Sequence, residues 1–167
     1  GEYERSARAC AANVILFHAA PPHFQFDVEE LVTQIVTTQP RLVFLCNPNN
    51  PTGFHLVDSA VQRISTAKAN HLLILDESYR AFVTLSPFGQ PSNENTIVLR
   101  SMTKDFSLAG LRLGYALAQP KWINAMRSYQ PPWSVNGAAQ AVGLAALSDL
   151  DYVRRTLELT RHNAAAL

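Results

Sequence analysis

The chain has 167 residues, of which 47% are hydrophobic and 16% charged, and its formal net charge is +1. This composition favours one α/β domain with a well-buried core and excludes a disordered chain. The basic residues form no block, no apolar run reaches the roughly 18 residues of a membrane span, and the histidines lack ligand spacing. We therefore expect no nucleic acid, no membrane and no metal among the partners.

Short apolar runs and helical patterns alternate along the chain, an order typical of a largely parallel sheet that is covered by helices. Several of these runs are continuous rather than alternating, as expected of strands that are buried on both faces. We predict strands over residues 13–18, 41–46, 71–76, 96–100 and 112–117.

Helical patterns lie between and after these strands. One begins at Asp27, which forms a capping-box pattern with Glu30, and the next covers residues 57–69 with Asn70 at its end. A third starts near Pro120, because proline favours the first turn of a helix. Two further helices are predicted over residues 136–148 and 152–167.

The cysteines and the two ends of the chain bear on its setting. Cys10 and Cys46 are far apart and lack the spacing of a metal site or a disulfide framework, which favours a reducing compartment. The charged start of the chain is unlike a signal peptide, and its last residues fall inside a helical pattern. We therefore expect a cytoplasmic protein, and we expect this chain to be a fragment of it.

Polar residues follow three of the predicted strands, and ligands of open α/β sheets bind at the carboxyl ends of strands. Singly, each of these segments is compatible with an ordinary turn, cap or salt bridge, but together and in this order they are specific. They are Asn-Pro-Asn-Asn-Pro-Thr-Gly at 47–53, Asp-Glu-Ser-Tyr at 76–79, Ser-Met-Thr-Lys at 101–104 and Gly-Leu-Arg-Leu-Gly at 110–114.

Lys104 and Asp76 are the sharpest candidates for chemistry. Lys104 follows a buried run, and partial burial disfavours its ammonium form and yields a nucleophilic amine suited to Schiff-base chemistry. Asp76 closes a strand at the edge of an apolar core, where a carboxylate needs a cationic partner such as a protonated pyridine nitrogen. Tyr79 and Asn50 could both donate hydrogen bonds to an oxygen on such a ring.

Arg112 and the hydroxyls of Ser101 and Thr103 form a candidate phosphate site, because a guanidinium grips a dianion with two hydrogen bonds. Lys104 and Arg112 must then meet at one ligand, although only a short connection joins them. A parallel crossover needs about a dozen residues or more, so we predict that strand 112–117 runs antiparallel to its neighbours.

As an ordered set, these motifs resemble the class I/II aminotransferases, which are pyridoxal-phosphate-dependent enzymes of fold type I. Histidinol-phosphate aminotransferases and threonine-phosphate decarboxylases are the most similar members. The resemblance implies a three-layer α/β/α large domain over residues 1–150, incomplete at its N-terminus, with a mostly parallel sheet and one antiparallel strand. It also implies that residues 151–167 begin a helix leading to a small domain outside the chain, and that the protein is a homodimer.

The resemblance further implies a role for each candidate residue. Lys104 would form the Schiff base with pyridoxal phosphate, Asp76 would pair with the pyridine nitrogen, and Asn50 and Tyr79 would bind the 3′-oxygen. The phosphate would be held by Ser101, Thr103 and Arg112. Because the aromatic residue that stacks on the cofactor and part of the phosphate cup precede Gly1 in this family, we expect the chain alone to carry no covalent cofactor.

The function that this resemblance implies is transamination of an amino acid or a phosphorylated amino compound, histidinol-phosphate aminotransferase-like. Threonine-phosphate decarboxylation is the alternative, because residues 130–136 resemble that group and the orientation of the substrate decides which bond breaks. Two other classes remain open. A non-catalytic, aminotransferase-like regulatory domain would share the fold, and an ATPase Walker B strand would fit residues 72–77. The latter needs a phosphate-binding loop that these residues lack, and it leaves Asn50 and Lys104 unexplained.

Overall fold

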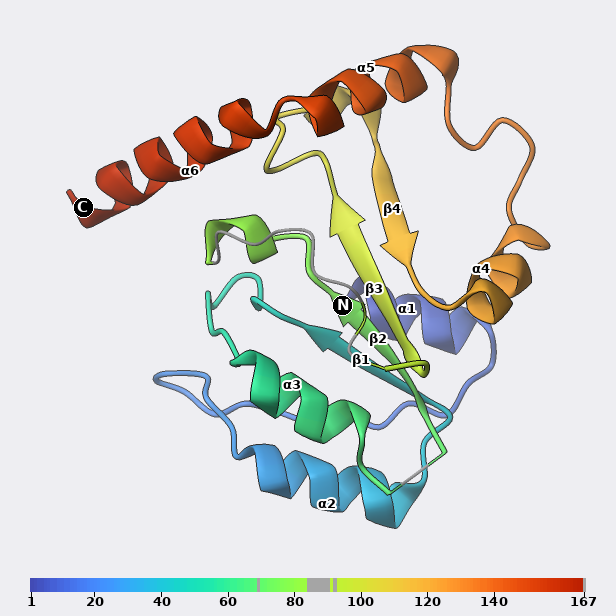
Figure 1. The fold of residues 1–167 in the computed structure, drawn as a ribbon. Helices are drawn as coiled ribbons and strands as arrows, with labels where there is room; N and C mark the ends of the chain where they lie inside the picture. Colours follow the sequence, from blue (N-terminus) through green and yellow to red (C-terminus); the bar gives the residue numbers. More distant parts are fainter. Residues whose placement is uncertain (69, 84–90, 92, 167) are drawn as a thin grey trace.

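The centre of the molecule is a four-stranded sheet in the order β1-β2-β3-β4 (Figure 1). The structure is a computed structural model, and it describes residues 1–68, 70–83, 91 and 93–166. The first three strands are parallel and β4 is antiparallel to β3, which confirms the predicted mixed sheet. The strands are β1 (Leu42–Cys46), β2 (Leu72–Asp76), β3 (Thr96–Ser101) and β4 (Gly114–Leu117).

Two helices cover one face of the sheet. α2 (Val28–Thr38) and α3 (Asp58–Ser65) lie side by side below the sheet in Figure 1. Their apolar stripes pack against side chains of β2 and β3 in one core, in which Ile64 and Leu73 are fully buried. Asp27 caps α2 as predicted, although its carboxylate accepts from the backbone N–H of Glu29, at 2.8 Å, two residues along the chain.

The other face of the sheet carries α1 (Glu2–Ala9), which the sequence analysis did not anticipate. Side chains of β1 alternate between the faces: Val43 and Leu45 pack against the core under α2 and α3, whereas Phe44 stacks on the ring of Tyr3 with centroids 5.1 Å apart. Helices therefore lie on both faces of the sheet, which agrees with the predicted three layers.

The last third of the chain is helical and only loosely packed on the rest. α4 (Pro120–Arg127) begins at its proline, as predicted, and Asn136 caps α5 (Gly137–Ser148), which is followed by α6 (Leu150–Ala165). Val153 and Leu157 of α6 pack into a second apolar cluster, with Met102 and Phe106 from the turn after β3.

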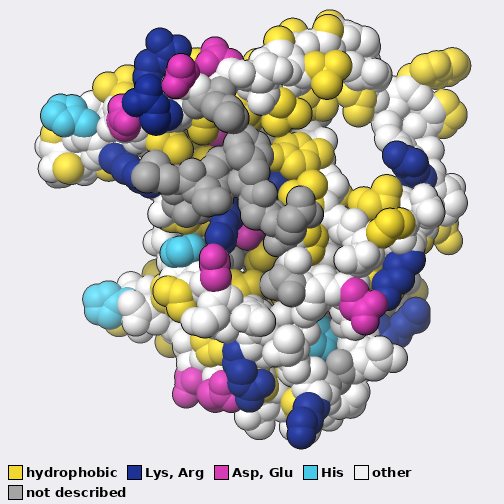
Figure 2. Space-filling model, in the orientation of Figure 1, with side chains coloured by type: hydrophobic (Ala, Val, Ile, Leu, Met, Phe, Trp, Pro, Cys, Tyr) yellow, Lys and Arg dark blue, Asp and Glu magenta, His cyan; other side chains and the backbone are white. Residues whose placement is uncertain are grey.

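Much of the apolar surface of α5 remains exposed. Its buried residues are Ala139 and Gly143, whereas Leu144 is 70% exposed. Figure 2 shows hydrophobic side chains gathered along the upper edge of the molecule, where α5 lies. The connection before α5 also exposes Tyr129 and Trp133, the latter at 96%. No helix in the part of the chain that the structure describes has the length and apolar character to cross a membrane.

Two expectations about the elements were wrong. Residues 13–18 form no strand, because the segment pairs with no edge of the sheet: Phe17 packs on the core, but Ile15 and Leu16 are 53% and 46% exposed. The helix expected over 57–69 ends at Ser65, where the hydroxyls of Ser65 and Thr66 both donate to the carbonyl of Gln62. Residue 69 and residue 167, the expected ends of two helices, lie outside the described residues.

Candidate active site

Lys104 lies at the carboxyl edge of the sheet, in the turn that follows β3. Its Nζ donates to the Oγ of Ser101 at 3.2 Å and sits 5.6 Å from the centroid of the Tyr79 ring. Tyr79 follows β2, the neighbouring strand, so the amine is held between the ends of two strands. The side chain is half-buried.

The hydroxyls of Ser101 and Thr103 face one another across 2.7 Å, and the backbone N–H of Thr103 donates to the Oγ of Ser101 at 3.4 Å. Met102 between them is buried in the second apolar cluster. The alternation that the sequence predicts is therefore present, and it gathers two hydroxyls beside the amine of Lys104.

Asp76 ends β2 and is paired in register with Cys46 of β1 and Leu99 of β3. One carboxylate oxygen accepts from the backbone N–H of Ser78 at 2.9 Å, and the other accepts from the hydroxyl of Tyr3. Tyr3 thus contacts a predicted site residue from 73 positions away, and sequence reasoning missed it. An N-terminal tyrosine carries no signal of its own for such a contact.

The loop after β1 brings Asn50 to the same edge, where its Nδ2 donates to the hydroxyl of Tyr79 at 3.4 Å. Asn47 fixes this loop, although the sequence analysis did not single it out. The Asn47 side chain is buried, donates to the carbonyl of Leu56 at 3.0 Å and accepts from its N–H at 2.8 Å. A buried amide that closes a loop in this way holds the position of the exposed Asn50.

Arg112 follows a short 3-10 helix (Ala109–Leu111) and has a left-handed backbone, with φ of 52°. Its guanidinium is exposed and donates to the carbonyl of Ala109 at 3.2 Å. The backbone carbonyl of Leu113, the next residue, accepts from the backbone N–H of Met102 at 3.1 Å. Arg112 therefore lies beside the turn that carries Ser101 and Lys104. Gly114 allows this approach, because a Cβ there would lie 2.8 Å from the carbonyl oxygen of Arg100.

Asp105, the neighbour of Lys104, and Tyr115 of β4 are two groups influenced by the charge of Arg100. Burial raises the pKa of the Asp105 carboxyl, and backbone hydrogen bonds together with the charges of Arg100 and Lys104 offset part of that rise. Burial likewise raises the pKa of the Tyr115 hydroxyl, with Arg100 opposing it. The carboxyl of Asp105 and the hydroxyl of Tyr115 are therefore partly desolvated.

The predicted site residues are thus found at one edge of the sheet. Side-chain contacts link Asn50 to Tyr79, Tyr79 to Lys104, Lys104 to Ser101, and Ser101 to Thr103. Asp76 lies at the end of β2, the strand between β1 and β3. Arg112 lies in the loop before β4, and its guanidinium is bonded to Ala109 within that loop.

Residues 1–166 match the family model described as aminotransferase class I and II. The chain belongs to this family. A histidinol-phosphate aminotransferase of Rhodospirillum centenum is 34% identical over 171 residues, which cover 98% of this chain and 46% of that protein. An aromatic amino acid aminotransferase of Nocardia farcinica is 40% identical over 134 residues, covering 75% of this chain and 37% of that protein.

Among solved structures, the aminotransferase fold is matched by a histidinol-phosphate aminotransferase from Sinorhizobium meliloti in complex with pyridoxal-5′-phosphate. That match has a TM-score of 0.81 at 25% identity and covers 93% of this chain and 43% of the other. The chain spans less than half the length of the curated relatives named above. The α/β fold with one antiparallel strand is therefore that of the family.

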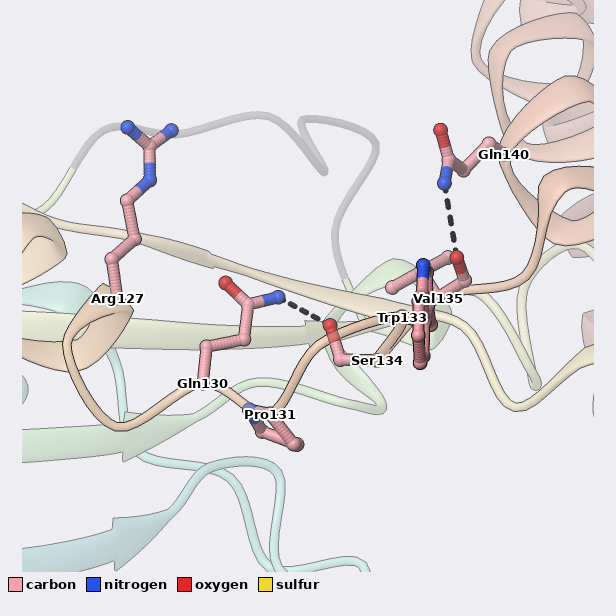
Figure 3. Close-up of a pocket in the computed structure, with 7 residues that line it drawn as sticks. All are labelled: Arg127, Gln130, Pro131, Trp133, Ser134, Val135 and Gln140. Atoms are coloured by element: carbon pink, nitrogen blue, oxygen red, sulfur yellow. Dashed lines mark hydrogen bonds between the residues drawn. The ribbon is translucent and has the colours of Figure 1, made fainter.

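A separate hollow lies in the connection between α4 and α5 (Figure 3). It is lined by Arg127, Gln130, Pro131, Trp133, Ser134, Val135 and Gln140. Gln130 donates to the hydroxyl of Ser134 and Gln140 donates to the carbonyl of Val135 at 3.0 Å, so part of its polar lining is already satisfied. None of its lining residues belongs to the candidate active site.

Proposed function

We propose that the protein is a pyridoxal-phosphate-dependent aminotransferase that acts on an amino acid or a phosphorylated amino compound. The single observation that carries this proposal is the half-buried amine of Lys104, which is bonded to Ser101 and lies over the ring of Tyr79 at the carboxyl edge of the sheet. Family membership supports the reaction class.

The chemistry of the donor set fits the cofactor. Two hydroxyls and the exposed guanidinium of Arg112 are suitable ligands for a phosphate, and Asp76 is a suitable partner for a protonated ring nitrogen. The hydroxyl of Tyr3 already donates to one oxygen of Asp76. On binding, the ring nitrogen would share the carboxylate with Tyr3, or Tyr3 would withdraw.

Pyridoxal phosphate, when bound, supplies an electron-withdrawing ring that stabilises negative charge on the substrate α-carbon. The chain's own residues would do the rest. Lys104 would supply the nucleophilic amine and afterwards move the proton at the α-carbon, as a general acid and base. Asn50 and Tyr79 would orient the ring through its 3′-oxygen, and Asp76 would keep the ring nitrogen protonated.

The assay that tests the reaction class is product analysis of the intact protein with a panel of amino acids and phosphorylated amino compounds. With an oxo acid present as amino acceptor, transamination converts the amino group of the substrate to an oxo group, leaves any carboxylate in place and yields the amino acid of the acceptor, whereas decarboxylation releases carbon dioxide and leaves an amine. Both curated relatives named above are aminotransferases, which favours the first outcome over the threonine-phosphate decarboxylase alternative. Release of carbon dioxide with every substrate that reacts would overturn the proposed reaction.

The finer features of the protein belong to the same proposal. Residues 1–150 would form part of the cofactor-binding domain, and residues 151–167 would lead toward a second domain. The protein would be a homodimer in the cytoplasm. The dimer is supported by the exposed apolar surface of α5, because solvent-exposed apolar patches commonly mark interfaces. Light scattering of the intact protein should give the mass of a dimer, and a monomer at high concentration would contradict it.

A further inference from the structure

A buried pair of charged side chains lies directly behind the candidate active site. Glu77 follows Asp76 at the end of β2, and Arg100 precedes Ser101 in β3. Because successive side chains of a strand point to opposite faces, this pair occupies the face of the sheet turned away from the site residues. Glu77 and Arg100 are 6% and 8% exposed.

The contacts of this pair extend across several elements. The Nε of Arg100 donates to the Oε2 of Glu77 at 2.8 Å, and an Nη of the same guanidinium lies 2.5 Å from that oxygen. The other oxygen of Glu77 lies 3.2 Å from Arg80, which is bonded through two nitrogens to Asp58 at the start of α3, at 2.9 and 3.0 Å. The network therefore ties β3, β2 and α3 together at the level of the site.

Arg100 also lies near the turn that carries Lys104. Tyr115 of β4 is the register partner of Arg100, and the charge of Arg100 offsets part of the rise that burial causes in the pKa of the Tyr115 hydroxyl. The charges of Arg100 and Lys104 likewise both offset part of the rise that burial causes in the pKa of Asp105, which follows Lys104 in the chain. The guanidinium thus stands at the point where three neighbouring strands and the lysine turn meet.

Stability alone is a weak reason for such a pair. Taking two charges out of water is costly, and apolar side chains of similar size often serve a core equally well. Burial indeed raises the pKa of the Glu77 carboxyl, with the two arginines offsetting part of the rise. What an ion pair adds over apolar packing is direction, because the planar guanidinium donates to a carboxylate in few orientations.

We propose that the Glu77–Arg100 pair is a positioning device that fixes the end of β2 against the end of β3, and so sets the spacing between Asp76 and Lys104. The inference rests on the proposed function, in which these two residues act on one cofactor. Glu77 and Arg100 would touch neither substrate nor cofactor. They would act through the backbone, since each is joined directly to a site residue.

The test compares Glu77→Gln and Arg100→Lys with a matched control in the intact protein. Glu29→Gln makes the same change in another pair between elements, because Glu29 of α2 binds Arg63 of α3 at 2.7 Å, but that pair is exposed and joins two helices rather than two strand ends. For each folded variant, one measures the dissociation constant of pyridoxal phosphate, the visible circular dichroism per bound cofactor, and kcat.

We expect Glu77→Gln and Arg100→Lys to weaken cofactor binding, to reduce the circular dichroism of the bound chromophore, and to lower kcat by about 10- to 100-fold. Glu29→Gln should match the wild type in all three. If Glu77→Gln fails to fold, Arg100→Lys carries the test, because it leaves a cation beside Glu77 but cannot make both contacts.

Two results would overturn the inference, and they can be told apart. If the folded variants have lower melting temperatures but unchanged affinity, dichroism and kcat, the pair is only structural and the proposed function stands. If the wild-type protein itself binds no pyridoxal phosphate, the proposed function fails and the inference fails with it.

Discussion

The carboxyl edge of the sheet and the core between the sheet and helices α2 and α3 are built from the same strands but are held together in different ways. In the core, Ile64 and Leu73 are fully buried among apolar neighbours. At the edge, Asn50 and Lys104 are held by single polar contacts of 3.4 and 3.2 Å and remain partly open to solvent. The difference teaches that fold and chemistry can be altered separately in this chain.

The largest effect should come from removing the amine at the edge. Lys104→Ala should abolish the covalent link to pyridoxal phosphate and lower kcat by at least about 10²–10⁴-fold, the share of an acid–base group alone. Lys104→Arg keeps a positive charge but should not restore activity, because arginine stays protonated. Unfolding of both variants should resemble that of the wild type, and activity of Lys104→Arg close to the wild-type level would remove Lys104 from its proposed role.

The opposite result is expected in the core. Ile64→Ala should lower the free energy of unfolding by about 2–5 kcal/mol, because it leaves a cavity among α2, α3 and the sheet. Val36→Ala, on the exposed side of α2, should change it by about 0.5 kcal/mol or less. Denaturant titration measures both values. Equal effects of the two substitutions would contradict the separation between a tightly packed core and its outer surface.

A smaller effect on chemistry is expected for Asp76→Asn. The amide keeps the shape of the side chain but cannot hold a ring nitrogen in its protonated state, so turnover should fall by about 10²-fold while the cofactor still binds to Lys104. Stopped-flow kinetics and borohydride reduction separate the two steps. Loss of the covalent link in this variant would show that Asp76 anchors the cofactor rather than tuning it.

The smallest effect concerns the outer end of the buried charge network. The guanidinium of Arg80 holds the pKa of the Asp58 carboxyl below its ordinary value, chiefly through their hydrogen bonds. The stabilisation is therefore present above the ordinary pKa of aspartate and is lost as the pH falls through the lowered folded-state pKa. Because Asp58 is mostly exposed, Asp58→Asn should cost about 1 kcal/mol or less at neutral pH and nothing at strongly acidic pH. An equal cost at both pH values would contradict the pairing.

The sequence predicted those parts of the molecule whose cause is local. The short link between Lys104 and Arg112 was sufficient to predict that β4 is antiparallel, and Pro120 marks the start of its helix. Residues 13–18 show the limit of this reasoning, because an apolar run does not reveal whether a strand edge is available to it.

Contacts between distant positions could not be predicted in this way. Tyr3 reaches Asp76 across 73 positions, and Glu77 reaches Arg100 across 23. Both contacts arise when strands and helices come together, and nothing in the sequence pairs these particular residues. The motifs identified the residues of the site, whereas the structure identifies the residues that surround and support them.

The most direct test of the account is to locate the cofactor on the chain. The intact protein is incubated with pyridoxal phosphate, reduced with borohydride, digested and analysed by mass spectrometry. The chain has three lysines, and the label should be found on Lys104 and not on Lys68 or Lys121. A label on Lys68 or Lys121 instead, with Lys104 unmodified, would contradict the proposed active site.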